Sequence, residues 1–456
     1  MFKKVLIANR AIPALRSIQT FRELKIKSVV PYSEADRDSL PVLFADEAVC
    51  IGPPAPADSY ANISRLLSAA EISGCDAVYP GWGFLACDAE FADATLTLGK
   101  TFIGPSPEPL RLLRDRLTLR QVLNKVDVPI LPGSDASLTN PAAAVEICQK
   151  LGLPCAVKPV SNRISTLRII RKEKDIEYQV RMCQAEVRAR TGTDQVYLER
   201  FVPAARKVEV HLLATGERTF VLNDWEVMLQ TGGEKILAIA PAQGITPAQR
   251  QQIYSWATAA TTALQITGSV TIQFLIEKDG KTWFSQVNPG VCSLHPLTEV
   301  RTGIDIVEEQ VKIAAHLAGS SRFQVLGSPN QELITKNQEL FAVATQGFAE
   351  NPDAEFEPSP GIVVDLHLPG GPGIRVDSHL YTGWTIPGDY DLHIATITAW
   401  GSTLRGAVNR LVRGLTETTI SGVATNLNFI LALIKTPGFG SEDWCIRELG
   451  NGKMGE

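Results

Sequence analysis

Polar side chains interrupt two short, mostly apolar strings of this chain. Gln273 stands at the centre of the first string, TIQFL, and Gln286 and Asn288 stand in the second, FSQVN. Glutamine and asparagine side chains are polar but supply no negative charge. Because hard Mg²⁺ sites rely on carboxylates and phosphates for their ligands, we expect these strings to hold no metal.

A second informative feature is the absence of glycine between Gly152 and Gly192. Lys158 lies near the start of this segment, at the end of an apolar string. The residues that follow it include Asn162, Arg163, Ile164 and Leu167. A backbone wraps closely around a triphosphate only where no side chain intervenes and positive φ angles are allowed. This segment therefore does not predict a phosphate-binding loop.

The first hundred residues alternate short apolar strands with helices, which is the pattern of a doubly wound parallel sheet. Strands are predicted at 4–8, 28–32, 47–51, 77–79 and 101–103, and helices at 13–24, 62–73 and 91–98. A single helical stretch is predicted over 109–126.

A smaller α/β unit is predicted from 128 to about 201, ending in a strand at 196–201. A mixed sheet follows, with strands at 208–213, 219–222, 268–276 and 282–287 and helices at 247–264 and 305–317. After a polar linker at 319–337, short strands are expected near 361–367 and 394–400, and helices at 404–416 and 425–435.

Composition excludes several classes of protein. The 456 residues carry a net charge of -5, which gives no reason to expect nucleic acid or an anionic membrane as partner. The eight cysteines are scattered without a C-x-x-C pair, which favours reduced thiols over a metal or disulfide framework. No stretch approaches the length of a membrane span. We expect a soluble, cytoplasmic protein.

Seven strings of the chain resemble the biotin carboxylase subunit of bacterial acetyl-CoA carboxylase, a member of the ATP-grasp superfamily. They are KKVLIANR (3–10), YSEADRD (32–38), ADEAVCIGP (45–53), FIGP (102–105), PGSD (132–135), HPLTE (295–299) and TGID (302–305). The resemblance implies an α/β fold with three domains. These are a doubly wound N-terminal domain (1–113), an ATP-grasp domain (114–318, lid about 130–203) and a mixed α+β C-terminal domain (330–446). The family carboxylates biotin on a carrier protein, using bicarbonate and Mg-ATP.

The resemblance also implies that the chemistry-bearing positions of the family are replaced here. The two metal-binding glutamates fall at Gln273 and Gln286, the bicarbonate arginine at Gly290, the catalytic base at Leu294 and the enolate arginine at Gln346. Leucine cannot accept a proton, and losing a general base typically costs ~10²–10⁴-fold in rate. We therefore predict no catalytic residue and no metal ligand, and lean towards a chain that is not an enzyme.

Other family positions keep their chemistry and could still hold ATP or ADP weakly. They are Arg116, Lys158, Glu199, Phe201, Gln230, Lys235 and Asn288. Residues 374–379 and Glu23 match family positions near the subunit interface, although exposed salt bridges would explain them equally well.

These residues favour a non-catalytic homologue that acts as a structural or regulatory subunit of an acetyl-CoA carboxylase-type complex. Its expected partners are an active biotin carboxylase paralogue or the biotin carboxyl carrier protein, which would bring the biotin, in a homo- or hetero-dimer.

Two alternatives stay open. The chain could be an ATP-grasp ligase with altered or residual nucleotide-dependent activity, using Lys158, Lys235, Glu226 or Glu234. It could also be a small-molecule sensor whose emptied cleft is lined by Trp82, Cys292, Leu294 and Ile239, unless these residues pack as core.

Overall fold

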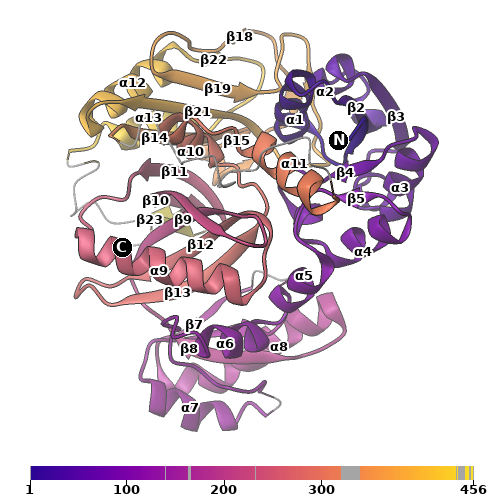
Figure 1. The fold of residues 1–456 in the computed structure, drawn as a ribbon. Helices are drawn as coiled ribbons and strands as arrows, with labels where there is room; N and C mark the ends of the chain where they lie inside the picture. Colours follow the sequence, from indigo (N-terminus) through magenta and orange to yellow (C-terminus); the bar gives the residue numbers. More distant parts are fainter. Residues whose placement is uncertain are drawn as a thin grey trace.

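The computed structural model describes residues 2–138, 140–162, 166–231, 233–319, 339–437, 439, 447–450 and 453–454. The N-terminal part, a small lid and the C-terminal part surround a large central sheet (Figure 1). Residues 163–165 of the glycine-free segment and 320–337 of the predicted linker lie outside the described residues.

The N-terminal part is a five-stranded parallel sheet with the order β3-β2-β1-β4-β5, which confirms the predicted doubly wound topology. Its strands are β1 (Lys4–Ile7), β2 (Lys27–Ser33), β3 (Glu47–Gly52), β4 (Ala77–Tyr79) and β5 (Thr101–Phe102). Its helices are α1 (Ala11–Glu23), α2 (Leu40–Phe44), α3 (Ile63–Ile72) and α4 (Ala89–Thr97). Short 3-10 turns occupy Glu34–Asp36, Pro56–Asp58 and Phe84–Cys87.

The single helical stretch predicted over 109–126 is two helices, α5 (Pro107–Leu113) and α6 (Arg116–Asn124). Asp115 stands between them, and its Oδ1 accepts hydrogen bonds from the Leu117 and Thr118 amides at 2.8 and 2.9 Å. A capping aspartate satisfies amide groups that have no partner inside the helix. The spacing of apolar residues does not indicate such a cap, so one continuous helix was predicted in place of two.

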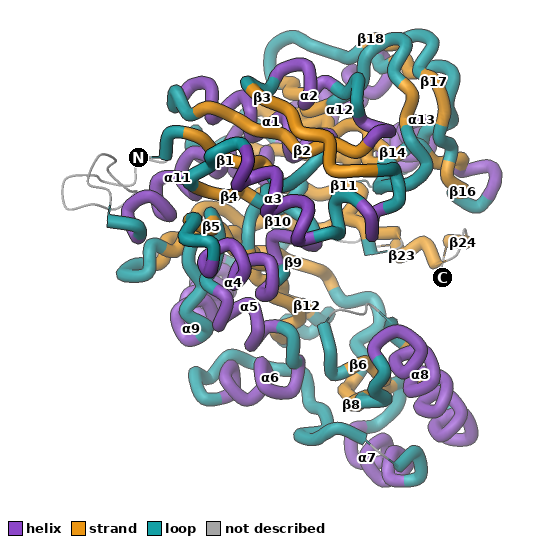
Figure 2. The backbone as a smooth tube through the Cα atoms, turned by 90° about the vertical axis from the view of Figure 1, so that its right-hand side faces the viewer, coloured by secondary structure: helices purple, strands orange, loops and turns teal. Residues whose placement is uncertain are grey.

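The lid is a three-stranded sheet with the order β7-β6-β8 and two helices. Its elements are α7 (Ala143–Leu151), β6 (Cys155–Pro159), β7 (Arg168–Ile170), α8 (Ile176–Thr191) and β8 (Val196–Arg200), with a 3-10 turn at Glu173–Asp175. Figure 2 shows the lid projecting from the rest of the molecule. Its small apolar core includes Val157, Val180 and Leu198, which are fully buried.

The central sheet has ten strands, and its main path β13-β12-β9-β10-β11-β14-β21-β19 is antiparallel throughout. The bounds are β9 (Arg206–Ala214), β10 (Thr219–Thr231), β11 (Glu234–Ala240), β12 (Gly268–Ile276), β13 (Thr282–Pro289), β14 (Phe341–Phe348), β19 (Ile374–Ser378) and β21 (His393–Gly401). A parallel pairing joins only β23 (Arg447–Gly450) to β10 within the described part of this sheet. The region predicted as a mixed sheet is therefore almost wholly antiparallel.

Strand β10 runs nine residues beyond the predicted end at 222. Asn223 and Asp224 follow the predicted end, and both side chains are buried. The Asp224 carboxylate accepts hydrogen bonds from the Ala242 amide at 2.7 Å and from Arg250 at 2.8 Å. A buried polar group is tolerated when it is paired in this way, and the strand continues through it.

Helices cover both ends of the central sheet. They are α9 (Pro247–Ala263), α10 (His295–Thr302), α11 (Ile306–Leu317), α12 (Leu404–Glu417) and α13 (Leu427–Ile434). The C-terminal part adds short strand pairs: β15 (Glu350–Asn351) with β16 (Glu357–Pro358), β17 (Gly361–Ile362) with β20 (Thr385–Ile386), β18 (Leu366–His367) with β22 (Thr419–Ile420), and β23 with β24 (Lys453–Met454). A 3-10 turn occupies Pro352–Ala354. The predicted domain boundaries stay a prediction.

Candidate functional site

The central sheet brings several of the predicted site residues together. On β12, Gln273 lies opposite Gln286 of β13, and Thr271 lies opposite Asn288. On the neighbouring strand pair, Gln230 of β10 lies opposite Lys235 of β11. Side chains alternate between the two faces of a strand. On β9, Val208 and Val210 belong to the apolar core with α9, so Glu209 points to the opposite face.

Glu209 is the centre of this face, and the sequence analysis missed it. Its side chain is fully buried, and its carboxylate lies 2.5 Å from the Lys235 ammonium. It also accepts hydrogen bonds from Trp225 Nε1 and from Gln273 Nε2, each at 2.8 Å. Burial favours the neutral lysine, but the Glu209 charge more than offsets it and raises the pKa of Lys235. The alternation KVEVHLL on β9 was a signal that could have found this glutamate.

The side chains on this face do not form a suitable set of ligands for a divalent metal ion. Gln273 turns its Nε2 towards Glu209, because a carboxylate can only accept hydrogen bonds. Gln286 donates from Nε2 to Asn288 Oδ1 at 2.7 Å. Neutral amides supply no charge, and Lys235 already neutralises Glu209. Among the described residues, no group of three or more His, Cys, Asp and Glu side chains is arranged to hold a metal.

Leu294 lies at the start of α10 and is only 1% exposed. It packs in an apolar cluster with Trp225, Ala238, Leu297 and other residues. Ile239, which was expected to line the same cleft, is also 1% exposed but belongs to a different cluster under α12 and α13. These two residues therefore pack as core, and the pocket proposed for a small-molecule sensor loses its apolar lining.

Trp82 and Cys292, the other two residues expected in that pocket, are partly exposed. The Trp82 ring contacts the His295 ring in a tilted arrangement, with centroids 5.1 Å apart and an interplanar angle of 52°. Burial raises the pKa of the Cys292 thiol to about 11, so the thiol is protonated at neutral pH. This cysteine is therefore a poor nucleophile.

The positions where the resemblance placed two arginines hold no cation. Gly290 has φ of +86° at the end of β13, and a Cβ there would lie 3.4 Å from the Ala86 methyl group. Gln346 of β14 is 1% exposed and donates from Nε2 to the Ser293 hydroxyl at 2.7 Å. The Gln346 side chain is thus held by a contact within the chain, and the positive φ of Gly290 would strain any other residue at that position.

The predicted adenine side lies at the junction of the lid and the central sheet. Lys158 of β6 forms an ion pair with Glu199 of β8, which also accepts a hydrogen bond from the Tyr197 hydroxyl at 3.0 Å. Burial would raise the pKa of Glu199, but Lys158 and Arg120 lower it. Arg116 donates to two backbone carbonyls, those of Pro159 and Ser161, at 2.8 Å each.

The remaining predicted residues lie in several parts of the fold. Phe201 is partly buried after β8, and its amide donates to the Pro154 carbonyl at 3.0 Å. Glu226, named for the ligase alternative, forms an ion pair with Arg206 at 2.6 Å. Glu234 is exposed at the start of β11. In the glycine-free segment, the Asn162 amide donates to the Arg114 carbonyl at 2.8 Å, and Leu167 is 43% exposed.

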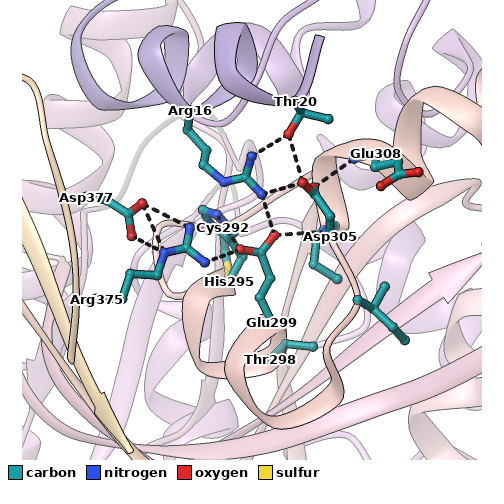
Figure 3. A network of polar contacts seen from close by, with 12 residues as sticks. Arg16, Thr20, Cys292, His295, Thr298, Glu299, Asp305, Glu308, Arg375 and Asp377 are labelled. Carbon is teal, nitrogen blue, oxygen red and sulfur yellow. Dashed lines mark hydrogen bonds and ion pairs between the residues drawn. The ribbon is translucent and has the colours of Figure 1, made fainter. Parts of the chain in front are cut away.

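A cluster of charges joins the N-terminal, central and C-terminal parts of the molecule (Figure 3). Arg16 of α1 lies 3.0 Å from Glu299 of α10 and 2.9 Å from Asp305. Arg375 of β19 lies 2.5 Å from the other Glu299 oxygen and 2.8 Å from Asp377. Burial would raise the pKa of Glu299, but the positive charges of His295, Arg16 and Arg375 lower it to about 2. Burial lowers the pKa of His295 itself, so at neutral pH the charges of Arg16 and Arg375 are the ones that lower the pKa of Glu299.

Arg375 and Asp377 were predicted to lie at a subunit interface or in exposed salt bridges. They are mostly buried in the charge cluster of their own chain, so an exposed salt bridge does not describe them. The position near a subunit interface stays a prediction. Glu23, the third such residue, is exposed on α1.

Three family models match the chain in sequence. They are the biotin carboxylase N-terminal domain over residues 1–110, the carbamoyl-phosphate synthase L chain ATP-binding domain over 115–319, and the biotin carboxylase C-terminal domain over 348–450. The biotin carboxylase of Haemophilus influenzae is 38% identical over 430 residues, covering 94% of this chain and 93% of that protein. The chain belongs to the biotin carboxylase family. Biotin carboxylase 1 of Bacillus subtilis is 34% identical over 97% of both chains.

Solved biotin carboxylase structures share the fold. The complex of Campylobacter jejuni biotin carboxylase with β,γ-ATP superposes with a TM-score of 0.89 at 30% identity, over 96% of both chains. The biotin carboxylase domain dimer of Hydrogenobacter thermophilus 2-oxoglutarate carboxylase, bound to MgADP, ADP and bicarbonate, gives 0.88 at 31% identity. It covers 96% of this chain and 95% of that one. The predicted ATP-grasp fold is confirmed.

The comparisons favour one of the functional predictions over another. The relatives carry the names of biotin carboxylases, which favours the alternative of an ATP-grasp ligase over the non-catalytic interpretation. Nothing in the comparisons shows that this biotin carboxylase homologue is inactive, binds nucleotide only weakly or takes no metal. In the described part of the chain, no helix is long and apolar enough to cross a membrane.

Proposed function

We propose that this chain is a biotin carboxylase homologue that does not carboxylate biotin by itself. The observation that carries this proposal is the burial of Leu294 in an apolar cluster, at the position that the family resemblance gives to the catalytic base. Carboxylation needs a base within hydrogen-bond reach of the proton that moves. Glu209, the carboxylate on the same side of the sheet, is fully buried and already takes three donors.

Electrostatics supports the same proposal. Phosphoryl transfer to bicarbonate develops negative charge that fixed cations and metal ions must stabilise. Gly290 and Gln346 supply no charge at the two positions where the family has arginines. Removing one such donor typically costs ~10²–10³-fold in kcat. Losses within one site are non-additive, but here base, arginines and metal carboxylates are replaced together.

The retained scaffold suits a structural or regulatory subunit of an acetyl-CoA carboxylase-type complex. We propose that the chain pairs with itself or with an active biotin carboxylase paralogue, or holds the biotin carboxyl carrier protein. A related domain forms a dimer in Hydrogenobacter thermophilus 2-oxoglutarate carboxylase. Biotin would reach this complex only on the carrier protein, and ATP or ADP would bind weakly through Lys158, Lys235 and their neighbours.

This proposal predicts that the chain, purified by an affinity tag from its native cell, brings down a biotinylated protein or an intact biotin carboxylase. Streptavidin blotting detects the first and peptide mass spectrometry the second. Elution of the full chain as a lone protein, under conditions where an intact carboxylase complex stays assembled, would contradict it.

The second candidate is an ATP-grasp ligase of biotin carboxylase type with altered or residual activity. The sequence comparisons favour it, because 38% identity over nearly the whole chain is shared with a named biotin carboxylase. Release of phosphate from Mg-ATP by the purified chain tests it. Sustained release that rises with bicarbonate or another acceptor would replace the first candidate with the second.

A further inference from the structure

We propose that Arg116 latches the lid to the body of the molecule, the central sheet with its helices, and so holds the lid in one orientation. The latch consists of Arg114 and Arg116 at the turn between α5 and α6, and of residues 159–162 on the lid. The inference goes beyond the proposed function, because it concerns the mobility of the lid and requires neither a partner nor a nucleotide.

Two backbone hydrogen bonds form the first part of the latch. Arg116 is the first residue of α6, and the amide of a first helical residue has no partner inside its own helix. This amide donates to the Val160 carbonyl at 2.9 Å, and the Asn162 amide donates to the Arg114 carbonyl at 2.8 Å. The residues between these two bonds form an antiparallel bridge. The chain that follows β6 therefore pairs with the turn between α5 and α6.

The Arg116 guanidinium forms the second part of the latch. Its Nη1 donates to the Pro159 and Ser161 carbonyls at 2.8 Å each, on either side of Val160. Burial lowers the pKa of Arg116, because the charged form loses contact with water, and the two carbonyls replace part of that solvation. Hydrogen bonds from a charged donor contribute more than those between neutral groups. The side chain that the family resemblance assigned to a nucleotide thus holds the lid backbone.

Helix α6, which carries the latch, is fixed to the body of the molecule. Leu119 and Leu123 belong to the apolar core between the central sheet and α9. Arg120 lies one turn after Arg116, on the same face of the helix, and its Nη2 donates to the Leu131 carbonyl at 2.8 Å. Since Leu131 lies at the base of the lid, α6 directs both arginines towards the lid while its leucines anchor it in the body.

In the described part of the chain, the lid shares no large apolar interface with the body. The apolar core of the lid lies within residues 138–198, and the lid projects from the rest of the molecule (Figure 2). Near the two chain crossings, Leu131 and Val202 pack in a small apolar cluster, and Arg200 pairs with Glu277 at 2.6 Å. Domains without a large apolar interface are expected to move relative to each other. The latch, which is distant in sequence from both crossings, restricts this motion.

Distances between the lid and the body, measured by double electron–electron resonance on the full chain, test the latch. Spin-labelled unnatural amino acids replace Tyr178, which is exposed on α8, and Gln252, which is exposed on α9. We expect one narrow distance distribution, and Arg116→Met should increase its width about twofold because the lid is then free to move. Lys125→Met, which removes an exposed charge at the end of α6, is the matched control and should change nothing. A broad distribution before any latch substitution, or an unchanged one in Arg116→Met, overturns the proposal.

Hydrogen exchange provides a second arm that does not depend on the labels. The Asn162 amide should exchange about tenfold faster in Arg116→Met, a loss of about 1.4 kcal/mol of protection. Asn162→Pro removes this amide without changing α6, so it should broaden the lid distances even where Arg116→Met unfolds. Equal exchange of the Asn162 amide in Arg116→Met and Lys125→Met, or unchanged lid distances in Asn162→Pro, overturns the proposal.

Discussion

Replacing Glu299 with alanine is expected to lower the free energy of unfolding by about 3–5 kcal/mol, the usual cost of leaving buried charge without its partner. Glu299 is 8% exposed and lies between Arg16 and Arg375, at 3.0 and 2.5 Å. Its removal leaves two arginines facing each other at the junction of three parts of the molecule. Urea denaturation at pH 7, followed by circular dichroism, measures the change.

The matched control for Glu299→Ala is Glu146→Ala. Glu146 pairs with Lys150 at 2.7 Å, but both side chains are more than 70% exposed. Such pairs contribute little to stability, so no measurable change is expected. Equal effects of the two substitutions would show that the charge cluster does not hold the three parts together.

The pH dependence of Glu299→Ala follows from the lowered pKa. The carboxylate has a pKa of about 2 in the folded chain and 4.5 as its reference value. Its contribution to stability is therefore fully present above about pH 4.5 and is lost as the pH falls towards 2. The stability difference between wild type and variant should narrow over this range and stay constant between pH 6 and 8.

Replacing Leu294 with glutamate is expected to cost about 4 kcal/mol of stability at pH 8 and to produce no carboxylation. The substitution removes a buried hydrocarbon side chain and puts a charge among Trp225, Ala238 and Leu297. Burial raises the pKa of a carboxyl group, so the fold tolerates the protonated form best. The cost should therefore shrink as the pH falls from 8 to 5, which unfolding measured at both pH values will show.

Leu294→Met is the matched control for this substitution. It keeps the volume and apolar character of the side chain, and such changes usually cost less than about 1.5 kcal/mol. If Leu294→Glu were as stable as Leu294→Met at pH 8, the side chain would face water. The cleft would then be open, contrary to the packing described above.

The sequence predicted the N-terminal sheet well, because its central strands β1 and β4 are buried on both faces and are therefore almost continuously apolar. The positions of Gln273 and Gln286 on adjacent strands were also predictable, since both follow from strand pattern and order. The full length of β10, which has polar residues at its centre, was not predictable. The Asp224 carboxylate is satisfied by Ala242 and Arg250, and only the folded chain shows those partners.

The candidate site was predictable as a set of replaced positions but not as a set of contacts. Glu209 gave no signal beyond its alternation on β9, and its three donors come from three other strands. Arg16 and Glu299 are 283 residues apart in sequence. Leu294 and Ile239 were both apolar candidates for an empty cleft, and only their packing shows that they fill separate parts of the core.

The most direct test of the central claim is phosphate release from Mg-ATP, measured with and without free biotin in the presence of bicarbonate. The Haemophilus influenzae biotin carboxylase serves as the positive control. The family resemblance implies that base, arginines and metal carboxylates are replaced together, so we predict that biotin-dependent release by this chain is at least ~10⁴-fold below the control. Biotin-dependent phosphate release within about tenfold of the control would contradict the account. Such a ratio corresponds to a difference of only about 1.4 kcal/mol in activation free energy.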